Sequence, residues 1–179
     1  MACTLLYFVI ENKIYDRENN WITDFFNGTI HTIKVWPILF IIGWHRIVPQ
    51  EVLDTAKIRI GIHSSLLPKD RGSSPINWQI IRGDKIGGVT LFHLTTGVDA
   101  GEIIDQEKYE IKFNDDVREV YFKATSSSIN LLEKNWNQFH NKKIHSLPQN
   151  EGEITLNDRR KPGDGRINWL KNSTDCHNW

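Results

Sequence analysis

The sequence predicts an α/β fold: an open, mainly parallel sheet flanked by helices, followed by a short irregular C-terminal extension. Three observations support this prediction. Residues 35–42 form a nearly continuous apolar run, as expected of a central parallel strand that is covered on both faces. Residues 58–63 alternate isoleucine with Arg59, Gly61 and His63, and this period of two indicates a strand with two different faces. Predicted strands and helices then alternate along the chain, which is the pattern of a parallel sheet.

The first half of the chain supplies strands and one short helix. Residues 5–10 are apolar and partly β-branched, which predicts a strand. Residues 21–34 are ambiguous between element types. A short helix is expected over 49–56, with a proline in its first turn, and the strand that follows it closes at His63.

The second half begins with a loop over 64–74 that is rich in serine, proline and glycine. A helix is predicted over 75–82, because a proline opens it and a glycine follows it. Strands are predicted over 88–94 and 102–111, and the segment between them is a loop that contains three glycine or alanine residues around an aspartate.

The longest predicted helix spans 115–140. Residues 114–116 provide a capping side chain and an acidic first turn. Side chains then recur at roughly helical spacing: Val117, Tyr121, Ala124, Ser128, Leu131, Leu132, Asn135 and Phe139. After Asn141 the chain becomes polar and turn-rich. We therefore expect an α/β domain over 1–141 and an extension over 142–179 that ends without a closing structural element.

Composition limits the class of protein. The chain has 179 residues, of which 39% are hydrophobic and 25% charged, and its formal net charge is zero. This composition indicates a soluble globular domain, and the charge balance argues against a nucleic-acid partner. Cys3 and Cys176 suggest neither a metal site nor a disulfide framework, and with no signal or membrane-spanning pattern we expect a cytoplasmic protein. His45 and His63 lack an acidic or cysteine partner at ligand spacing, so no metal is predicted.

Two polar side chains mark one edge of the predicted sheet. His63 ends one strand, and Asp99 lies in the loop after another. Functional groups of open α/β sheets collect beyond the carboxyl ends of their strands. We therefore expect a crevice with His63 on one wall and Asp99 on the other.

Each candidate residue also has a structural interpretation. A lone histidine is more often structural than functional, and an aspartate among glycines often only forms a turn. His93 is expected to be an ordinary strand residue. Arg71 either binds an anion or bridges its loop to the sheet. Trp44 and Trp78 favour packing over ligand stacking.

Four motifs follow one another from position 63 onward: His-x-Ser-Leu-Leu-Pro-x-x-Arg-Gly from His63, Pro-x-x-Trp from Pro75, Gly-Val-Thr from Gly88 and Asp-x-Gly-x-Ile from Asp99. As an ordered set, they resemble the 10-formyltetrahydrofolate-dependent formyltransferase family. The likeness is strong over 37–106, weakens through the long helix and returns over 159–169.

The resemblance implies a Rossmann-like, formyltransferase-type sheet and a reaction in which a substrate amine attacks the formyl carbon of 10-formyltetrahydrofolate. His63 and Asp99 match the family's catalytic histidine and aspartate. By the same resemblance, Trp44, Arg46, Ile47, Val48, Gly97 and Val98 would bind the folate, and Ser65, Arg71 and Trp78 would bind the acceptor. The histidine can stabilise the oxyanion or relay the proton of the amine.

Two departures from the family concern Gly61 and the ends of the chain. The family carries an asparagine two residues before its histidine, and here that position is Gly61. Loss of one oxyanion donor typically costs about 10²–10³ in rate. By the same resemblance, the chain is expected to be short at both ends relative to the family, in its first βαβ portion and in the β-rich domain at the C-terminus. We leave open whether it is a compact variant, a shortened or split gene or an incomplete chain, and a truncated form of the β-rich domain is one interpretation of 142–179.

Three functions are left open at this point. The first is formyl transfer to the amine of a nucleotide-linked amino sugar. Its expected partners are small molecules, no membrane association is expected, and a homodimer is left open. It is favoured because residues 43–49 and 75–78 look more like the sugar-modifying members than those acting on initiator tRNA. The second is a catalytically impaired remnant or a folate- or nucleotide-binding module. The third is hydrolysis of formyltetrahydrofolate, with water as nucleophile.

Overall fold

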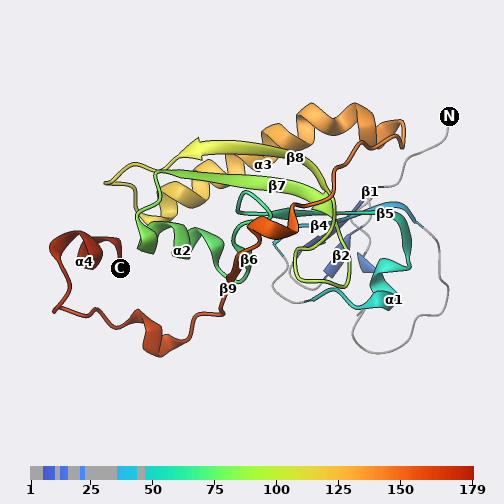
Figure 1. Cartoon of the computed structure of the whole chain (residues 1–179). Helices are drawn as coiled ribbons and strands as arrows, with labels where there is room; N and C mark the ends of the chain where they lie inside the picture. The colour runs from blue at the N-terminus through green and yellow to red at the C-terminus, as the bar shows by residue number, and fades with distance from the viewer. Residues whose placement is uncertain (1–5, 11–12, 16–20, 23–35, 44–46) are drawn as a thin grey trace.

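The fold is that of a computed structural model, which describes residues 6–10, 13–15, 21–22, 36–43 and 47–179. Its main sheet has seven strands in the order β3-β2-β1-β4-β5-β7-β8 (Figure 1). The bounds of these strands are β1 Leu6–Ile10, β2 Lys13–Tyr15, β3 Trp21–Ile22, β4 Trp36–Ile41, β5 Ala56–His63, β7 Ile86–His93 and β8 Ile103–Glu110. Most of the ambiguous stretch over 21–34 lies outside the described residues.

The α/β class and the sheet flanked by helices are confirmed. The three strands at the centre, β1, β4 and β5, run parallel to one another. On one side β2 and β3 are antiparallel, and on the other side β7 pairs antiparallel with both β5 and β8. The apolar run over 35–42 is therefore a central parallel strand, as its composition predicts.

The reversal at β7 follows from the length of the preceding helix. The chain leaves β5 at its carboxyl end, passes through the loop over 64–74 and then enters α2, Pro75–Arg82, a helix of eight residues. Such a helix is about 12 Å long, whereas the eight-residue strand β5 is about 26 Å long. The connection does not carry the chain back along the whole strand, so β7 begins near the edge where β5 ended and runs antiparallel.

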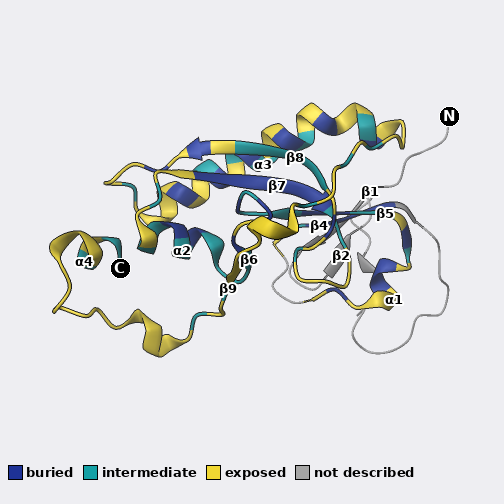
Figure 2. Ribbon diagram, viewed as in Figure 1, coloured by how far each residue is buried: buried dark blue, intermediate teal, exposed yellow. Residues whose placement is uncertain are grey.

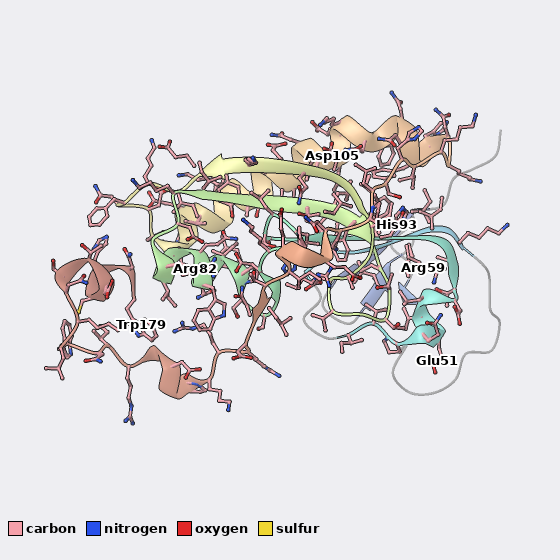
Figure 3. All side chains as sticks on the ribbon, in the orientation of Figure 1. Glu51, Arg59, Arg82, His93, Asp105 and Trp179 are labelled. Carbon is pink, nitrogen blue, oxygen red and sulfur yellow. The ribbon has the colours of Figure 1, made fainter. Side chains whose placement is uncertain are left out.

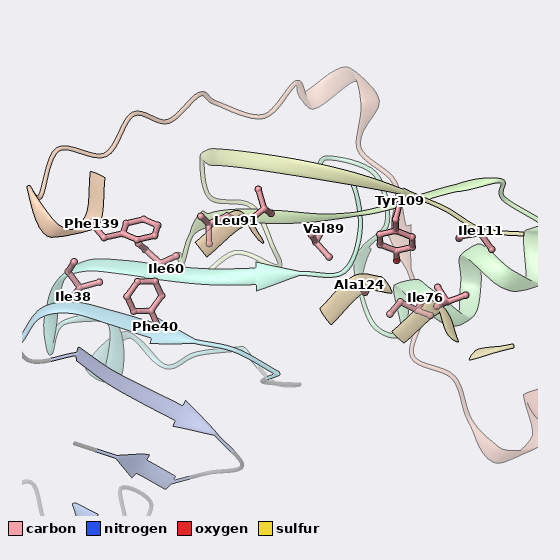
Figure 4. Close-up of a cluster of buried hydrophobic side chains, with 12 residues drawn as sticks. Ile38, Phe40, Ile60, Ile76, Val89, Leu91, Tyr109, Ile111, Ala124 and Phe139 are labelled. Carbon is pink, nitrogen blue, oxygen red and sulfur yellow. The ribbon is translucent and has the colours of Figure 1, made fainter. Parts of the chain in front are cut away.

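One face of the sheet is covered by α3, Val117–His140 (Figure 1). The main core lies between them and is built largely from alternate residues of the strands (Figure 4): Ile38, Phe40, Ile60, Val89 and Leu91 from the sheet, with Val120, Ala124, Leu131 and Phe139 from the helix. Phe40 meets Phe139 edge to face, with ring centroids 5.3 Å apart. This packing fixes β5 from behind and leaves its other face for the site.

The helix prediction is confirmed in position but differs in its buried stripe. Asp116 caps the helix in a reciprocal capping box with Glu119, in which each side chain accepts from the other's backbone N–H. The side chains of Val117 and Tyr121, which the spacing placed in the stripe, are 43% and 52% exposed. Ala124 is buried as predicted, and the buried position of the first turn is Val120, which the predicted stripe did not include.

The opposite face of the sheet is covered by α1, Gln50–Leu53, and by loops. A second apolar cluster lies here: Leu39, Ile41, Val48, Val52, Leu53 and Ala56, with Leu94 packed against it. Arg59, Gly61 and His63 lie on this face, because they alternate with the isoleucines that enter the main core.

The remaining chain runs back along the molecule and then away from the sheet. A short 3₁₀ turn, η1 (Glu151–Glu153), precedes β9, Leu156–Asn157, which pairs parallel with β6, Arg71–Gly72. Beyond it, the turn η2, Pro162–Gly165, leads to α4, Ser173–Asn178. The expectation that no element closes the chain is wrong, since α4 lies beside α2 and the ring of His177 stacks on Phe113 at 4.3 Å. Much of this extension is exposed (Figure 2).

Candidate active site

His63 and Asp99 are direct neighbours. Nδ1 of His63 lies 3.5 Å from Oδ2 of Asp99, and the two side chains are only 11% and 23% exposed. The expectation of two facing walls is therefore replaced by a closer arrangement, in which the carboxylate lies against the imidazole.

Asp99 reaches His63 by a route that a parallel sheet does not provide. Because β7 is antiparallel, its last residue, His93, pairs with Ile60 and lies about 10 Å before the end of β5. The loop after β7 then returns to the end of β5. Asp99 adopts a left-handed conformation in this loop, with φ of 46°, which aspartate tolerates better than most residues.

The second ring nitrogen of His63 is also engaged. Nε2 lies 2.8 Å from the backbone oxygen of Asp70, in the loop that follows β5. Since a carbonyl oxygen only accepts, Nε2 carries the hydrogen in this contact. A doubly protonated ring would donate to Asp70 with one nitrogen and to Asp99 with the other. The ring is thus held between a backbone dipole and a carboxylate.

Asp99 is held in turn by backbone groups. Its Oδ2 accepts a hydrogen bond of 2.8 Å from the backbone N–H of Gly72. Gly72 has φ of 94°, and the backbone oxygen of Asn157 lies 2.7 Å from where a Cβ would stand. The glycine is therefore required both by its backbone conformation and by the close approach of β9.

The loop after β5 is tied to the sheet by polar residues that the sequence reasoning missed. The buried hydroxyl of Thr90 donates to the backbone oxygen of Ser65 at 2.6 Å and accepts from the backbone N–H of Leu67 at 3.0 Å. Gln106, its partner on β8, donates to the same hydroxyl and to the oxygen of Leu67, both at 2.8 Å. The sequence feature that could have indicated these supports is a threonine within an otherwise apolar strand, with a glutamine in the strand that pairs with it.

The three predicted acceptor-binding residues make contacts within the protein. Ser65 is fully buried, and its hydroxyl donates to the oxygen of Lys69 at 2.7 Å. Arg71 donates through Nε and Nη2 to the side-chain oxygen of Gln149. The indole of Trp78 donates to the oxygen of Asp158, and the guanidinium of Arg160 lies 5.4 Å from its ring centroid. Their acceptor-binding role stays a prediction.

The predicted folate-binding residues are described only in part. Trp44 and Arg46 lie outside the described residues. Ile47 is 62% exposed, whereas Val48 is buried in the cluster of α1. Gly97 and Val98 lie exposed on the loop that carries Asp99.

A pocket of about 450 Å³ opens on the α1 face of the sheet. Figure 3 shows Arg59 and His93 at this end of the sheet. The pocket is lined by Gln50, Leu53, Lys57, Arg59, His93, Leu94, Thr95, Thr96 and Glu102. His93, expected to be an ordinary strand residue, is therefore at the strand end and borders a cavity.

Gly61 lies between this pocket and His63 on β5. In any larger residue at position 61, the Cβ would lie 2.6 Å from Cδ2 of Leu94 and 3.0 Å from Cε1 of Phe92. The space that a side chain at position 61 would enter is therefore occupied by two apolar side chains from β7 and the loop after it.

Within the part of the chain that the structure describes, no three histidine, cysteine or acidic side chains gather as metal ligands would. Within the same residues, no helix has the length and apolar character needed to cross a membrane.

The fold is that of a one-carbon transfer domain, and comparison with known proteins gives the family. A family model described as Formyl transferase matches residues 29–134, more than half of the chain. The chain belongs to the formyl transferase family.

Relatives in this family have been assigned different acceptors. The chain is 32% identical over 175 residues to the methionyl-tRNA formyltransferase of Acetivibrio thermocellus, with 96% of this chain and 55% of that protein covered. The crystal structure of the N-formyltransferase from Helicobacter canadensis, in complex with folinic acid and dTDP-3-aminofucose, matches with a TM-score of 0.73 and 29% identity over 84% of this chain and 56% of that one.

A second solved structure, WlaRD, is a sugar 3N-formyltransferase crystallised with dTDP and 5-N-formyl-tetrahydrofolate. It matches with a TM-score of 0.69 and 28% identity, covering 79% of this chain and 52% of that one. The chain thus spans about half the length of the relatives it matches.

Proposed function

We propose that the chain carries the catalytic part of an enzyme that transfers a formyl group from 10-formyltetrahydrofolate to the amine of a nucleotide-linked amino sugar. The observation that carries this proposal is the contact of 3.5 Å between Nδ1 of His63 and Oδ2 of Asp99, in a chain of the formyl transferase family. A histidine and a carboxylate so placed supply the two things that the reaction needs, namely stabilisation of negative charge and a path for a proton.

The reaction breaks one carbon–nitrogen bond and forms another. The acceptor amine attacks the formyl carbon, and the carbonyl oxygen becomes an oxyanion. The bond from that carbon to N10 of the folate then breaks, and the proton released by the amine ends on N10. Both N–H groups of a protonated His63 would be engaged with Asp70 and Asp99, so the imidazolium would stabilise the oxyanion through its positive charge. The Oδ1 atom of Asp99, for which no protein partner is seen among the described residues, would receive or pass on the proton.

One apolar cluster anchors two of the segments expected to hold formyl-folate. Val48 belongs to the cluster of α1, and Leu94, where the Asp99 loop begins, packs against it. Ile47 and Val98 extend from these anchored positions and are exposed. Exposed apolar side chains of this kind suit contact with a flat heteroaromatic ring such as a pterin.

The choice of an amino-sugar acceptor rests on two observations. The formal net charge of the chain is zero, whereas binding of tRNA draws mainly on basic side chains. The two structural matches with more than 25% identity that are described above were solved with dTDP or a dTDP-sugar. Because the chain is also similar to methionyl-tRNA formyltransferases, methionyl-tRNA is the competing acceptor.

One experiment separates the candidate functions. The protein is incubated with 10-formyltetrahydrofolate in three arms: without acceptor, with dTDP-3-aminofucose, and with methionyl-tRNA. Formylated sugar supports the proposal, whereas formylated methionyl-tRNA overturns the choice of acceptor. Release of tetrahydrofolate without acceptor indicates a hydrolase, and absence of turnover in all arms indicates a binding module or an impaired remnant.

A further inference from the structure

We propose that Gln149 is a positioning residue for the active site: its amide ties the Asp99 loop to Arg71 and so fixes the carboxylate of Asp99 against His63. The catalytic part of this inference rests on the proposed function. The geometric part does not, and it is tested separately below.

The amide of Gln149 makes four hydrogen bonds across the site. Its oxygen accepts from Nε and Nη2 of Arg71, at 3.0 and 2.7 Å. Its nitrogen donates to the backbone oxygens of Asp99 and Gly101, each at 2.7 Å. Both N–H groups and both lone pairs of the amide are thus used, and all four bonds bridge segments that are 48 to 78 residues away in the sequence.

Only a glutamine satisfies this set of partners. A glutamate would place a second acceptor oxygen against the backbone oxygens of Asp99 and Gly101, which cannot donate. An asparagine is one methylene shorter and could not span the same gap from the same backbone position. A leucine of similar size would leave those two oxygens and the guanidinium of Arg71 unpaired.

The segment that carries Gln149 is itself anchored at both ends. On one side, Leu147 and Ile103 exchange two backbone hydrogen bonds of 2.8 Å, so the chain is paired with the start of β8. On the other side, β9 pairs with Arg71 and Gly72. In Figure 1 the chain after α3 returns past the sheet to β9, beside β6.

The same segment also holds the second partner of His63. The backbone N–H of Asp70, whose oxygen meets Nε2 of His63, donates to the hydroxyl of Thr155 at 2.7 Å. The N–H of Arg71 donates to the oxygen of Thr155 at 2.9 Å. Residues 147–157 therefore brace both groups that contact the imidazole, and Gln149 is the brace on the Asp99 side.

The first test measures geometry and needs no activity. The backbone N–H of Gly72 donates to the carboxylate of Asp99, so its hydrogen-exchange protection reports whether that carboxylate is in place. Gln149→Leu and Gln149→Glu are expected to lower the protection of Gly72 by about tenfold or more, with little change in the slowest-exchanging core amides. Gln138→Glu is the matched control, because Gln138 bonds only within and just after α3 and should leave Gly72 unchanged.

The second test measures catalysis. We expect Gln149→Leu to lower kcat by about ten- to a hundredfold, the cost of a small misplacement of a reacting group, with KM for formyl-folate changed by less than about threefold. If Gln149 acts through Asp99, adding Gln149→Leu to Asp99→Asn should cost little further activity, as a double-mutant cycle detects.

The outcomes of the two tests are distinguishable. Unchanged protection of Gly72 in Gln149→Leu overturns the inference, whatever the activity. Loss of protection with a kcat effect fully additive to that of Asp99→Asn overturns the catalytic part. If the parent protein transfers no formyl group, the proposed function fails, while the exchange measurement still decides whether Gln149 positions Asp99.

Discussion

Leu94 occupies the space into which a side chain at Gly61 would extend, since its Cδ2 atom lies 2.6 Å from the position of a Cβ at residue 61. The asparagine that the resembling family carries there is therefore not simply missing, because its place has been filled from the neighbouring loop. Phe92, at 3.0 Å, closes the same space from β7.

This relationship predicts the behaviour of Gly61→Asn. The new side chain must displace Leu94, which costs about 1–3 kcal/mol in a packed region, so we expect no gain in single-turnover rate and a lower free energy of unfolding. Adding Leu94→Ala removes the obstruction, and the double variant should gain an appreciable part of the roughly 10²–10³ that one oxyanion donor supplies. Leu94→Ala alone is the control. A clear rate gain in Gly61→Asn by itself would contradict this reading.

His63→Ala should abolish formyl transfer while leaving the fold largely intact. The imidazole contributes one hydrogen bond, to the oxygen of Asp70, and such a bond is worth about 1 kcal/mol. Steady-state kinetics and urea unfolding measure the two effects. If activity stays within about tenfold of the parent, His63 has no place in the mechanism.

Asp99→Asn tests the charge of the carboxylate without disturbing the loop. Asparagine tolerates the left-handed backbone at φ of 46°, and its oxygen can still accept from Gly72. We expect a large loss of kcat, because the neutral amide no longer places a negative charge against the imidazole. A kcat within about tenfold of the parent value would mean that Asp99 only shapes the turn.

Tyr109→Phe should not weaken the protein at neutral pH. The Tyr109 hydroxyl is buried and finds no hydrogen-bond partner among the described residues, so its removal relieves a desolvated polar group. Burial, with a smaller effect of Tyr121, raises the pKa of Tyr109 to about 12.

The pH dependence of this prediction has a definite sign. A phenol whose pKa is higher in the folded than in the unfolded state stabilises the fold below the unfolded pKa of about 10, and this contribution is lost as pH rises through the folded pKa. Between pH 10 and about 12 the parent should therefore lose more stability than Tyr109→Phe, as urea unfolding at several pH values would detect. A loss of more than about 1 kcal/mol in the variant at pH 7 would contradict the prediction.

Several elements could be predicted because their signals are local. The alternation around Arg59 and Gly61 predicts β5, and the proline and glycine that bound 75–82 predict α2. The capping residues before Val117 predict the start of α3. The buried stripe of α3 was placed partly wrong, because Val120 and not Val117 is the residue of the first turn that enters the main core.

The candidate site was predicted less completely than the elements. His63 and Asp99 could be named from their motifs, but their contact depends on β7 running antiparallel and on a loop that returns to the end of β5. The polar supports, Thr90 and Gln106, were missed because each looks like an ordinary strand residue until the two strands are paired.

The sequence by itself determined the α/β class, the order and approximate bounds of the main strands and helices, and the identity of the histidine and aspartate. These properties are encoded in periodicity, caps and turn residues that act over a few positions. Tertiary structure alone decided that Leu94 fills the space beside Gly61, that Asp99 lies against His63, and that Gln149 joins Arg71 to the Asp99 loop. Such contacts join residues tens of positions apart, and they form only when the sheet is assembled and buried polar groups must find partners across it.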